Sequence, residues 1–244
     1  MKTSIAETNR ANQIQRKLIA ATLFACVAVL AITAPPAVAA TDKITSSTAL
    51  TLRTPSQQIS DAALLDVGIP TLNDGLYLTD ESDTVFPEVR YAEAIYFSNQ
   101  LAKVMEKSGA WGAIRVTPTD SVIMDLYITG TILQSDGETM DLDIQVRDSS
   151  GKQWFAKNYK QTTGKYAYDR RLKRLGDPFQ NLFIRIANDL LAYREKLSEQ
   201  QAIELRTISE LRFAKSFSPE AFDSYVSERR DGTLKIDRLP AEND

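Results

Sequence analysis

Histidine is absent from this 244-residue sequence, and cysteine occurs once, at Cys26. Without histidine, the chain lacks the side chain that most often acts as a general base or a zinc ligand near neutral pH. A single cysteine cannot form an intramolecular disulfide, so the stability of the fold must come from its core. Carboxylates or lysine alone can support catalysis, but these absences favour a binding protein over an enzyme.

Motifs for catalysis and cofactor binding are also missing. The sequence contains no glycine-rich phosphate loop, no zinc-ligand spacing and no nucleophilic-serine motif. Asp141 and Asp143 lie two residues apart on an expected strand, so both should point outward, but nothing indicates the cleft that glycosidase chemistry needs. The acidic segment 74–83 lacks the spacing of a calcium-binding EF-hand. We therefore predict no enzymatic activity, no metal and no cofactor.

The N-terminal segment, residues 1–40, has the order of parts found in a secretory signal peptide. Four basic residues precede an apolar segment of 17 residues, and the small residues Ala37 and Ala39 follow it. We predict cleavage near residue 40 and a periplasmic location. Two alternatives stay open: "LFAC" offers Cys26 for lipidation, and the uncharged span 18–41 is nearly long enough to be a retained membrane anchor.

The charge of the mature chain bears on its partners. Cleavage would remove four of the 29 basic residues and one of the 32 acidic residues, which leaves 25 and 31 and a net charge of −6. General nucleic-acid binding uses a net basic surface. We therefore expect no nucleic-acid partner.

Three regions follow the signal segment, and the first two are an irregular segment and a folded core. Residues 41–87 are expected to be a tether and irregular structure, with a short strand at Gly75–Thr79, because they are rich in Thr, Ser and Asp without a sustained hydrophobic period. Residues 88–197 are expected to form the folded core. Its first helix should begin near Pro87 and end at Gly109, where a left-handed cap fits.

The core alternates helix, strands and helix. A short strand is predicted at 113–118, and three longer strands at 124–134, 139–148 and 153–161. Apolar and polar residues alternate strictly in the second of the longer strands, which is typical of an antiparallel strand with one face in water. A second amphipathic helix starts near Asp177. The predicted fold class is α+β: an antiparallel sheet of about four strands, with helices packed on one face.

Residues 198–244 are expected to be a helical appendage. Apolar residues from Ile203 to Leu211 form a weaker stripe than that of the preceding helix, which this segment could continue. A new helix is indicated at Ser218 and Pro219, a capping residue followed by proline in the first turn.

The order of elements and three short motifs resemble a known group of envelope domains. The motifs are "SGAWGAIRVTP", "DLYITGTILQSDGE" and "RDSSGKQWFAKNY", in which the likeness rests on Gly109, Trp111, Asp125, Gly130 and Gly151. Residues 89–190 resemble the α+β domains of auxiliary lipoproteins of transport and secretion systems, such as the curli-secretion lipoprotein, and are similar in plan to the amino-terminal domain of TolB. The resemblance implies a non-enzymatic part in envelope assembly or transport, through protein contacts.

One segment concentrates positive charge. Between residues 157 and 174, seven basic residues accompany the single acid Asp169, and three tyrosines are interleaved with them. Such a segment could dock on an anionic membrane surface or an acidic protein face, or be a solvated loop. The candidate contact residues are Lys157, Lys160, Lys165, Arg170, Arg171, Lys173 and Arg174.

Together these features predict an exported envelope protein that serves as an accessory or adaptor component of an envelope assembly or transport system. The expected partner is an envelope protein, with an anionic membrane surface as a further contact. The alternative is a periplasmic carrier that holds a lipid or another apolar small ligand between sheet and helices. A large apolar cavity would favour the carrier, and an exposed apolar strip on the helices of residues 198–230 would favour the adaptor.

Overall fold

The computed structural model describes residues 42–44, 50–79, 85–164 and 177–240, all within one compact unit, Ala39–Asp244. The expected signal segment, and with it Cys26, lies outside the described residues.

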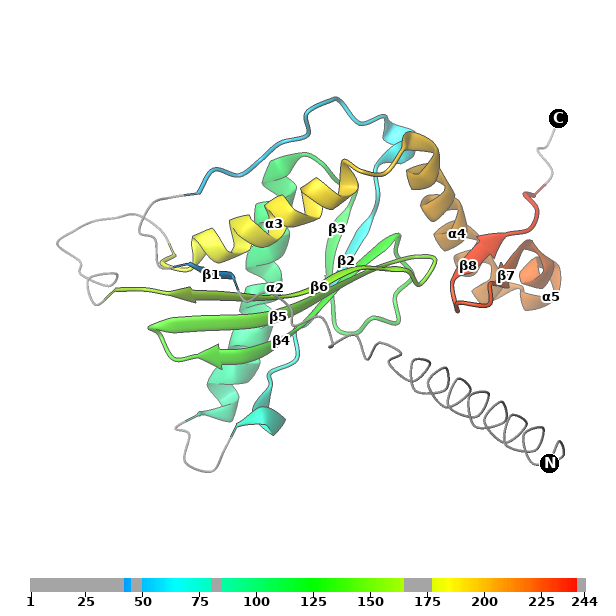
Figure 1. Cartoon of the computed structure of the whole chain (residues 1–244). Coiled ribbons are helices and arrows are strands. Elements are labelled where there is room, and N and C mark those ends of the chain that lie inside the picture. Colours follow the sequence, from blue (N-terminus) through cyan, green and yellow to red (C-terminus); the bar gives the residue numbers. More distant parts are fainter. Residues whose placement is uncertain (1–41, 45–49, 80–84, 165–176, 241–244) are drawn as a thin grey trace, which may run out of the picture. The chain divides into compact units, whose positions relative to one another are not determined.

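A six-stranded sheet with the order β1-β6-β5-β4-β2-β3 is at the centre of the fold (Figure 1). Strands β4, β5 and β6 form the expected antiparallel meander, and the shorter strands add parallel pairs: β1 with β6, and β2 with both β3 and β4. The α+β class is therefore confirmed, with a mixed sheet in place of a purely antiparallel one. The strands are β1 Asp42–Ile44, β2 Val67–Pro70, β3 Ile114–Thr117, β4 Leu126–Ser135, β5 Thr139–Asp148 and β6 Gln153–Thr162.

Strand β2 corrects the prediction of a tether and irregular structure over residues 41–87. It lies between β4 and β3, and all four of its residues are buried. The nearby side chains of Ala63, Leu65 and Leu72 also belong to the core. A short apolar segment that is buried on both faces shows no alternation, so the hydrophobic period does not reveal it.

The strand predicted at Gly75–Thr79 is wrong. The chain forms a 3₁₀ helix there, η2 (Leu76–Leu78), after Gly75 adopts a left-handed conformation with φ 69°. Asn73 Oδ1 accepts a hydrogen bond from Gly75 N–H (2.9 Å), and Asp74 Oδ1 accepts one from Leu76 N–H (3.0 Å). These two side chains turn the chain locally, in competition with a strand ladder.

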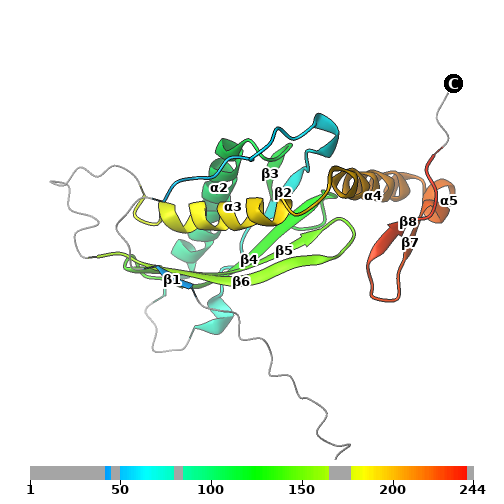
Figure 2. The same cartoon turned by 45° about the horizontal axis from the view of Figure 1, so that its top comes forward.

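Two helices, α2 (Pro87–Ser108) and α3 (Gln180–Arg194), pack on one face of the sheet (Figure 2). As expected, α2 begins at a proline and ends at Gly109, whose φ is 65°. The rings of Phe97 and Phe183 join the two helices, with centroids 6.0 Å apart. Buried side chains of both helices and of the sheet form one core cluster.

The C-terminal region begins with a separate helix, α4, because Ser198 caps it. Ser198 Oγ accepts a hydrogen bond from Gln201 N–H, and Gln201 Oε1 accepts one from Ser198 N–H. Ala202 and Leu205 belong to the core cluster, so the first half of α4 is part of the core rather than an appendage. The elements are α4 Glu199–Phe217, α5 Pro219–Phe222, η4 Asp223–Tyr225, and the hairpin strands β7 Val226–Glu228 and β8 Leu234–Ile236.

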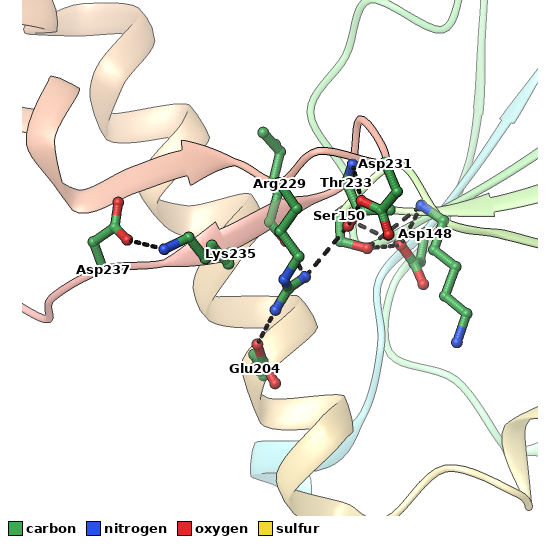
Figure 3. Close-up of polar contacts among 10 residues, drawn as sticks. Asp148, Ser150, Glu204, Arg229, Asp231, Thr233, Lys235 and Asp237 are labelled. Atoms are coloured by element: carbon green, nitrogen blue, oxygen red, sulfur yellow. Dashed lines mark hydrogen bonds and ion pairs between the residues drawn. The ribbon is translucent and has the colours of Figure 1, made fainter.

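The turn between β5 and β6 connects this C-terminal region to the sheet. Ser149 Oγ donates a hydrogen bond to Leu205 O of α4 (2.6 Å), and Arg212 Nη1 donates one to Ser149 O (3.0 Å). Leu234 N–H of the hairpin donates to Ser150 O (2.7 Å). Figure 3 shows the turn beside the β7–β8 hairpin.

One buried carboxylate, that of Asp148, holds the turn. Asp148 Oδ1 accepts hydrogen bonds from Ser150 N–H (3.0 Å), Ser150 Oγ (2.6 Å) and Lys152 N–H (3.1 Å). Asp148 Oδ2 accepts one from Trp154 Nε1 (2.9 Å). The four bonds satisfy the buried carboxylate and fix the indole ring, so the turn offers α4 and the hairpin a rigid docking point.

Candidate functional site

The start of α2 exposes an apolar surface. Five large apolar side chains, each between 47% and 63% exposed, define what we name the α2 surface: Phe86, Val89, Tyr91, Ile95 and Tyr96. Tyr77 and Leu78 of η2 are exposed as well, and η2 lies beside the start of α2 in Figure 1. Helical spacing places Tyr91 and Ile95 on one side of the exposed half of α2, and Phe86, Val89 and Tyr96 on the other. Exposed apolar side chains gathered in this way often mark contact sites on soluble domains.

The second half of α2 is different, because its exposed positions include Lys103, Glu106 and Lys107. The inward face of the whole helix is apolar, with Phe97 and Leu101 buried as the periodicity predicts. The sequence predicts this inward stripe, but the α2 surface was not predicted. The signal that could have found it is the excess of apolar residues off the stripe in the first half of the helix.

A cavity of about 820 Å³ lies between the start of α2 and the β4–β5 hairpin. Its apolar walls include Phe86 and Val89, which are also members of the α2 surface, so the cavity and the surface are continuous. Its lining residues are Thr79, Val85, Phe86, Val89, Arg90, Glu93, Leu133, Gln134, Ser135, Asp136 and Gly137.

Two of the charged side chains that line this cavity have incomplete hydrogen bonding. Arg90 is only 4% exposed, and its Nε lies 3.4 Å from Glu93 Oε2. Ser135 Oγ donates a hydrogen bond to Glu93 Oε1 (2.7 Å). Within the described part of the chain, Arg90 Nη1 and Glu93 Oε2 are buried without a hydrogen-bond partner. Both atoms are shielded from solvent, so the Arg90–Glu93 ion pair is the main electrostatic contact between these side chains.

Asp136 adds a negative charge to the lining. Burial acts to raise the pKa of Asp136, but hydrogen bonds from Thr139 N–H (2.7 Å) and Gln134 Nε2 (2.6 Å) lower it overall. Asp136 is therefore ionised at neutral pH. Because Arg90 and Glu93 compensate each other, the charged residues among the described part of the lining have a net charge of −1. Lys160 lies beside this wall, where its Nζ donates to Gln134 Oε1 (3.2 Å) and its charge helps to lower the pKa of Asp136.

The predicted basic contact residues are only partly described, and those that are do not share a surface. Lys157 Nζ lies 2.9 Å from Asp189 Oδ2 of α3, on the helix side of the sheet, and Lys160 Nζ lies 3.0 Å from Asp141 Oδ2 of β5. Both lysines therefore form ion pairs within the fold. The other five candidates, Lys165, Arg170, Arg171, Lys173 and Arg174, lie outside the described residues.

Asp141 and Asp143 occupy the face of β5 opposite its buried Leu142 and Ile144, as the alternation predicts. Asp141 is nevertheless only 8% exposed, because Lys160 and Asn158 Nδ2 (2.6 Å) cover its carboxylate. Burial, and then the charge of Asp141, raise the pKa of Asp143. The two carboxylates lie on the same face of one strand, where they form part of the polar side of the sheet. A hydrolase instead uses two carboxylates that flank the scissile bond from opposite sides.

A buried carboxylate that the sequence analysis did not single out as a site joins β2, β4 and α4. Asp66 N–H donates to Asp125 Oδ2 (2.8 Å), and Ser209 Oγ of α4 donates to Asp125 Oδ1. Burial raises the pKa of Asp125, and the hydrogen bonds from Ser209 and Asp66 N–H only partly offset it. Asp125 therefore holds these three segments together in the interior of the fold.

Among the described residues, no group of three or more His, Cys, Asp or Glu side chains is arranged to hold a metal ion. In the same part of the chain, no helix combines the length and apolar character that a membrane crossing requires.

Comparison with known proteins gives distant likenesses to solved structures. No family model and no curated protein matches the chain. A similar solved structure is the dodecamer of a point variant of PelC from Paraburkholderia phytofirmans, which is 16% identical, with 64% of this chain and 95% of that chain covered and a TM-score of 0.29. No conclusion about function follows from a match this distant.

Proposed function

We propose that this chain is an exported, non-enzymatic accessory or adaptor protein of a cell-envelope assembly or transport system, and that it binds a protein partner through the α2 surface. The single observation that carries the proposal is the exposure of five large apolar side chains at the start of α2. The signal-like segment at residues 1–40 supports export to the periplasm.

The packing of the interior supports an adaptor over a carrier. The side chains between the sheet and the helices, among them Phe97, Leu101, Phe183 and Ile186, are closely packed and at most 4% exposed. A carrier would need an apolar cavity in that position. Phe213 and Phe217 of α4 are also exposed and form a ring pair with centroids 4.8 Å apart, which is the kind of apolar feature that an adaptor would present on residues 198–230.

The side chains of the α2 surface are large enough to supply the binding energy of an interface with a protein partner. Complete burial of one large apolar side chain stabilises by about 1.5–3 kcal/mol, so two or three anchors at the centre of an interface can supply most of its binding energy. Tyrosine is among the residues enriched at such positions, and the α2 surface contains Tyr91 and Tyr96.

The test is a crosslinked pull-down from envelope fractions with the full chain, together with a mass measurement of its mature N-terminus. Ile95→Asp should abolish recovery of the crosslinked partner, whereas the matched change Lys103→Glu in the polar half of the same helix should preserve it. Equal recovery with both variants would contradict the α2 surface as the binding site. A retained N-terminus without lipid at Cys26 would instead indicate a membrane anchor.

A further inference from the structure

We infer that residues 50–60, which we name the strap, close over α3 and leave it as a unit while the core stays folded, and that their release lengthens the connection between the N-terminal segment and the fold. The inference goes beyond the proposed function and does not depend on the α2 surface. Figures 1 and 2 both show the strap running along α3.

Two asparagines of α3 hold the main chain of the strap. Asn181 Oδ1 accepts a hydrogen bond from Leu50 N–H (2.9 Å). Asn188 Oδ1 accepts one from Arg53 N–H (2.8 Å), and Asn188 Nδ2 donates one to Thr51 O (3.0 Å). Asn188 therefore pairs with the strap through both ends of its amide, as a neighbouring strand would.

Two carboxylates continue this row of contacts past the end of α3. Glu195 Oε1 accepts a hydrogen bond from Ser56 N–H (3.1 Å), and Glu195 Oε2 forms an ion pair with Arg53 Nη2 (2.7 Å). Glu199, at the start of α4, accepts a hydrogen bond from Ser60 Oγ. The strap is thus held by polar contacts along its whole length.

The spacing of the main-chain contacts fits an extended chain to a helix. Successive contacts are seven residues apart in α3 and three residues apart in the strap. Seven helical residues rise about 10.5 Å and return to nearly the same side of the helix. Three residues span at most about 10–11 Å, so the strap must run almost fully extended. A chain held at this limit has no slack, so the loss of one contact strains its neighbours and favours release of the whole strap.

The strap is separable from the core, because none of its residues is buried. Leu52 and Ile59 pack against the core while half-buried, whereas all four residues of β2 are buried. Segments with few buried apolar contacts and solvent-exposed hydrogen bonds open at a lower free energy than the core. The strap should therefore open without unfolding of the sheet.

Release ends at η1 (Asp61–Ala63), which stays with the core. Arg194 is only 5% exposed and donates a hydrogen bond to Ala63 O (2.7 Å). The eleven residues of the strap would thus come free, and fully extended they span about 36–40 Å. A fold that is held through its N-terminal segment would gain this additional reach.

The experiment follows trypsin cleavage after Arg53 and amide exchange in the full chain in mild detergent. Asn188→Ala removes two hydrogen bonds to the strap, and alanine is a good helix former, so the variant should fold with an unchanged Tm. Cleavage should accelerate about tenfold, and exchange at Leu50 and Ser56 should accelerate by a similar factor although Asn188 bonds neither. Glu210→Gln, exposed on α4, is the control and should behave as the unchanged chain does.

Acceleration confined to Arg53 would overturn release as a unit, and equal acceleration in β5 would overturn release from a folded core. The added reach is measured between spin labels at Thr51→Cys and Glu210→Cys, with Cys26→Ser in both samples. Removing all three α3 contacts with Asn181→Ala, Asn188→Ala and Glu195→Ala should add a broad component at longer distance. An unchanged distance distribution would overturn the lengthening.

Discussion

Replacing Asp148 by alanine should destabilise the fold and loosen the C-terminal region. The change removes the acceptor of four hydrogen bonds, from two backbone N–H groups, Ser150 Oγ and Trp154 Nε1. The side chain is 4% exposed, so its loss leaves buried donors without a partner.

The magnitude follows from the fate of each donor. The hydroxyl of Ser150 can rotate to another acceptor, and water can reach the N–H of the exposed part of the turn. The indole N–H of Trp154 cannot move, because its ring stacks on Tyr193 with centroids 4.6 Å apart. Each buried donor left without an acceptor costs about 1–3 kcal/mol. Because the Trp154 N–H bears most of this cost, we expect Asp148→Ala to lower the free energy of unfolding by about 3 kcal/mol. Ser150→Ala removes one of the four bonds and should cost about 1 kcal/mol.

Urea denaturation followed by tryptophan fluorescence measures both losses, and hydrogen exchange locates them. Because Ser149 and Ser150 hold α4 and the hairpin, exchange in residues 199–236 should accelerate in Asp148→Ala more than exchange in β4. Equal stability of Asp148→Ala and the unchanged chain would refute the role of this carboxylate. Uniform acceleration over the whole fold would refute the turn as the docking point of the C-terminal region.

Two further substitutions test the packing around the meander. Burial raises the pKa of Asp125 above its ordinary 3.8, so the protein loses stability as the pH rises through that raised value and the buried carboxyl ionises. Asp125→Asn removes this ionisation. The variant should therefore have a higher Tm than the unchanged chain at neutral pH and the same Tm in acid. The amide can still accept from Asp66 N–H and donate to Ser209 Oγ, and parallel Tm–pH curves for the two proteins would contradict the assignment. Gly130→Ala should lower the free energy of unfolding by about 2 kcal/mol in a urea titration, since its Cβ would lie 2.8 Å from the backbone oxygen of Asp143, which cannot turn aside as a side chain can. An unchanged midpoint would contradict this close approach of β4 and β5.

The meander and the two helices on its face could be predicted because each shows a regular signal. Strict alternation marks 139–148, tight turns bound its neighbours, and Gly109 ends α2 in the expected left-handed conformation. Strand β2 could not be predicted in this way, since all four of its residues are buried and neither period applies. Its partners β3 and β4 are set by tertiary contacts alone.

The candidate site was harder to predict than the fold. A helix is recognised from the residues that point inward, whereas the α2 surface consists of residues that point outward and depends on what the fold leaves uncovered. The pairing of Lys157 and Lys160 with carboxylates on opposite faces of the sheet could not be read from their spacing in a basic segment either. Whether a charge is free or paired is decided by neighbours distant in sequence.

Site-specific photocrosslinking in intact envelopes tests the central claim most directly. A photoreactive residue at position 95 should give a discrete crosslinked protein band, and the same residue at position 103, two turns further along α2, should not. The band should weaken when Tyr91→Ser is combined with the probe at position 95, because exposed Tyr91 lies one turn away on the same side of the helix. Bands of equal strength at both positions, or no band at position 95 in a chain that is folded and exported, would contradict binding through the α2 surface.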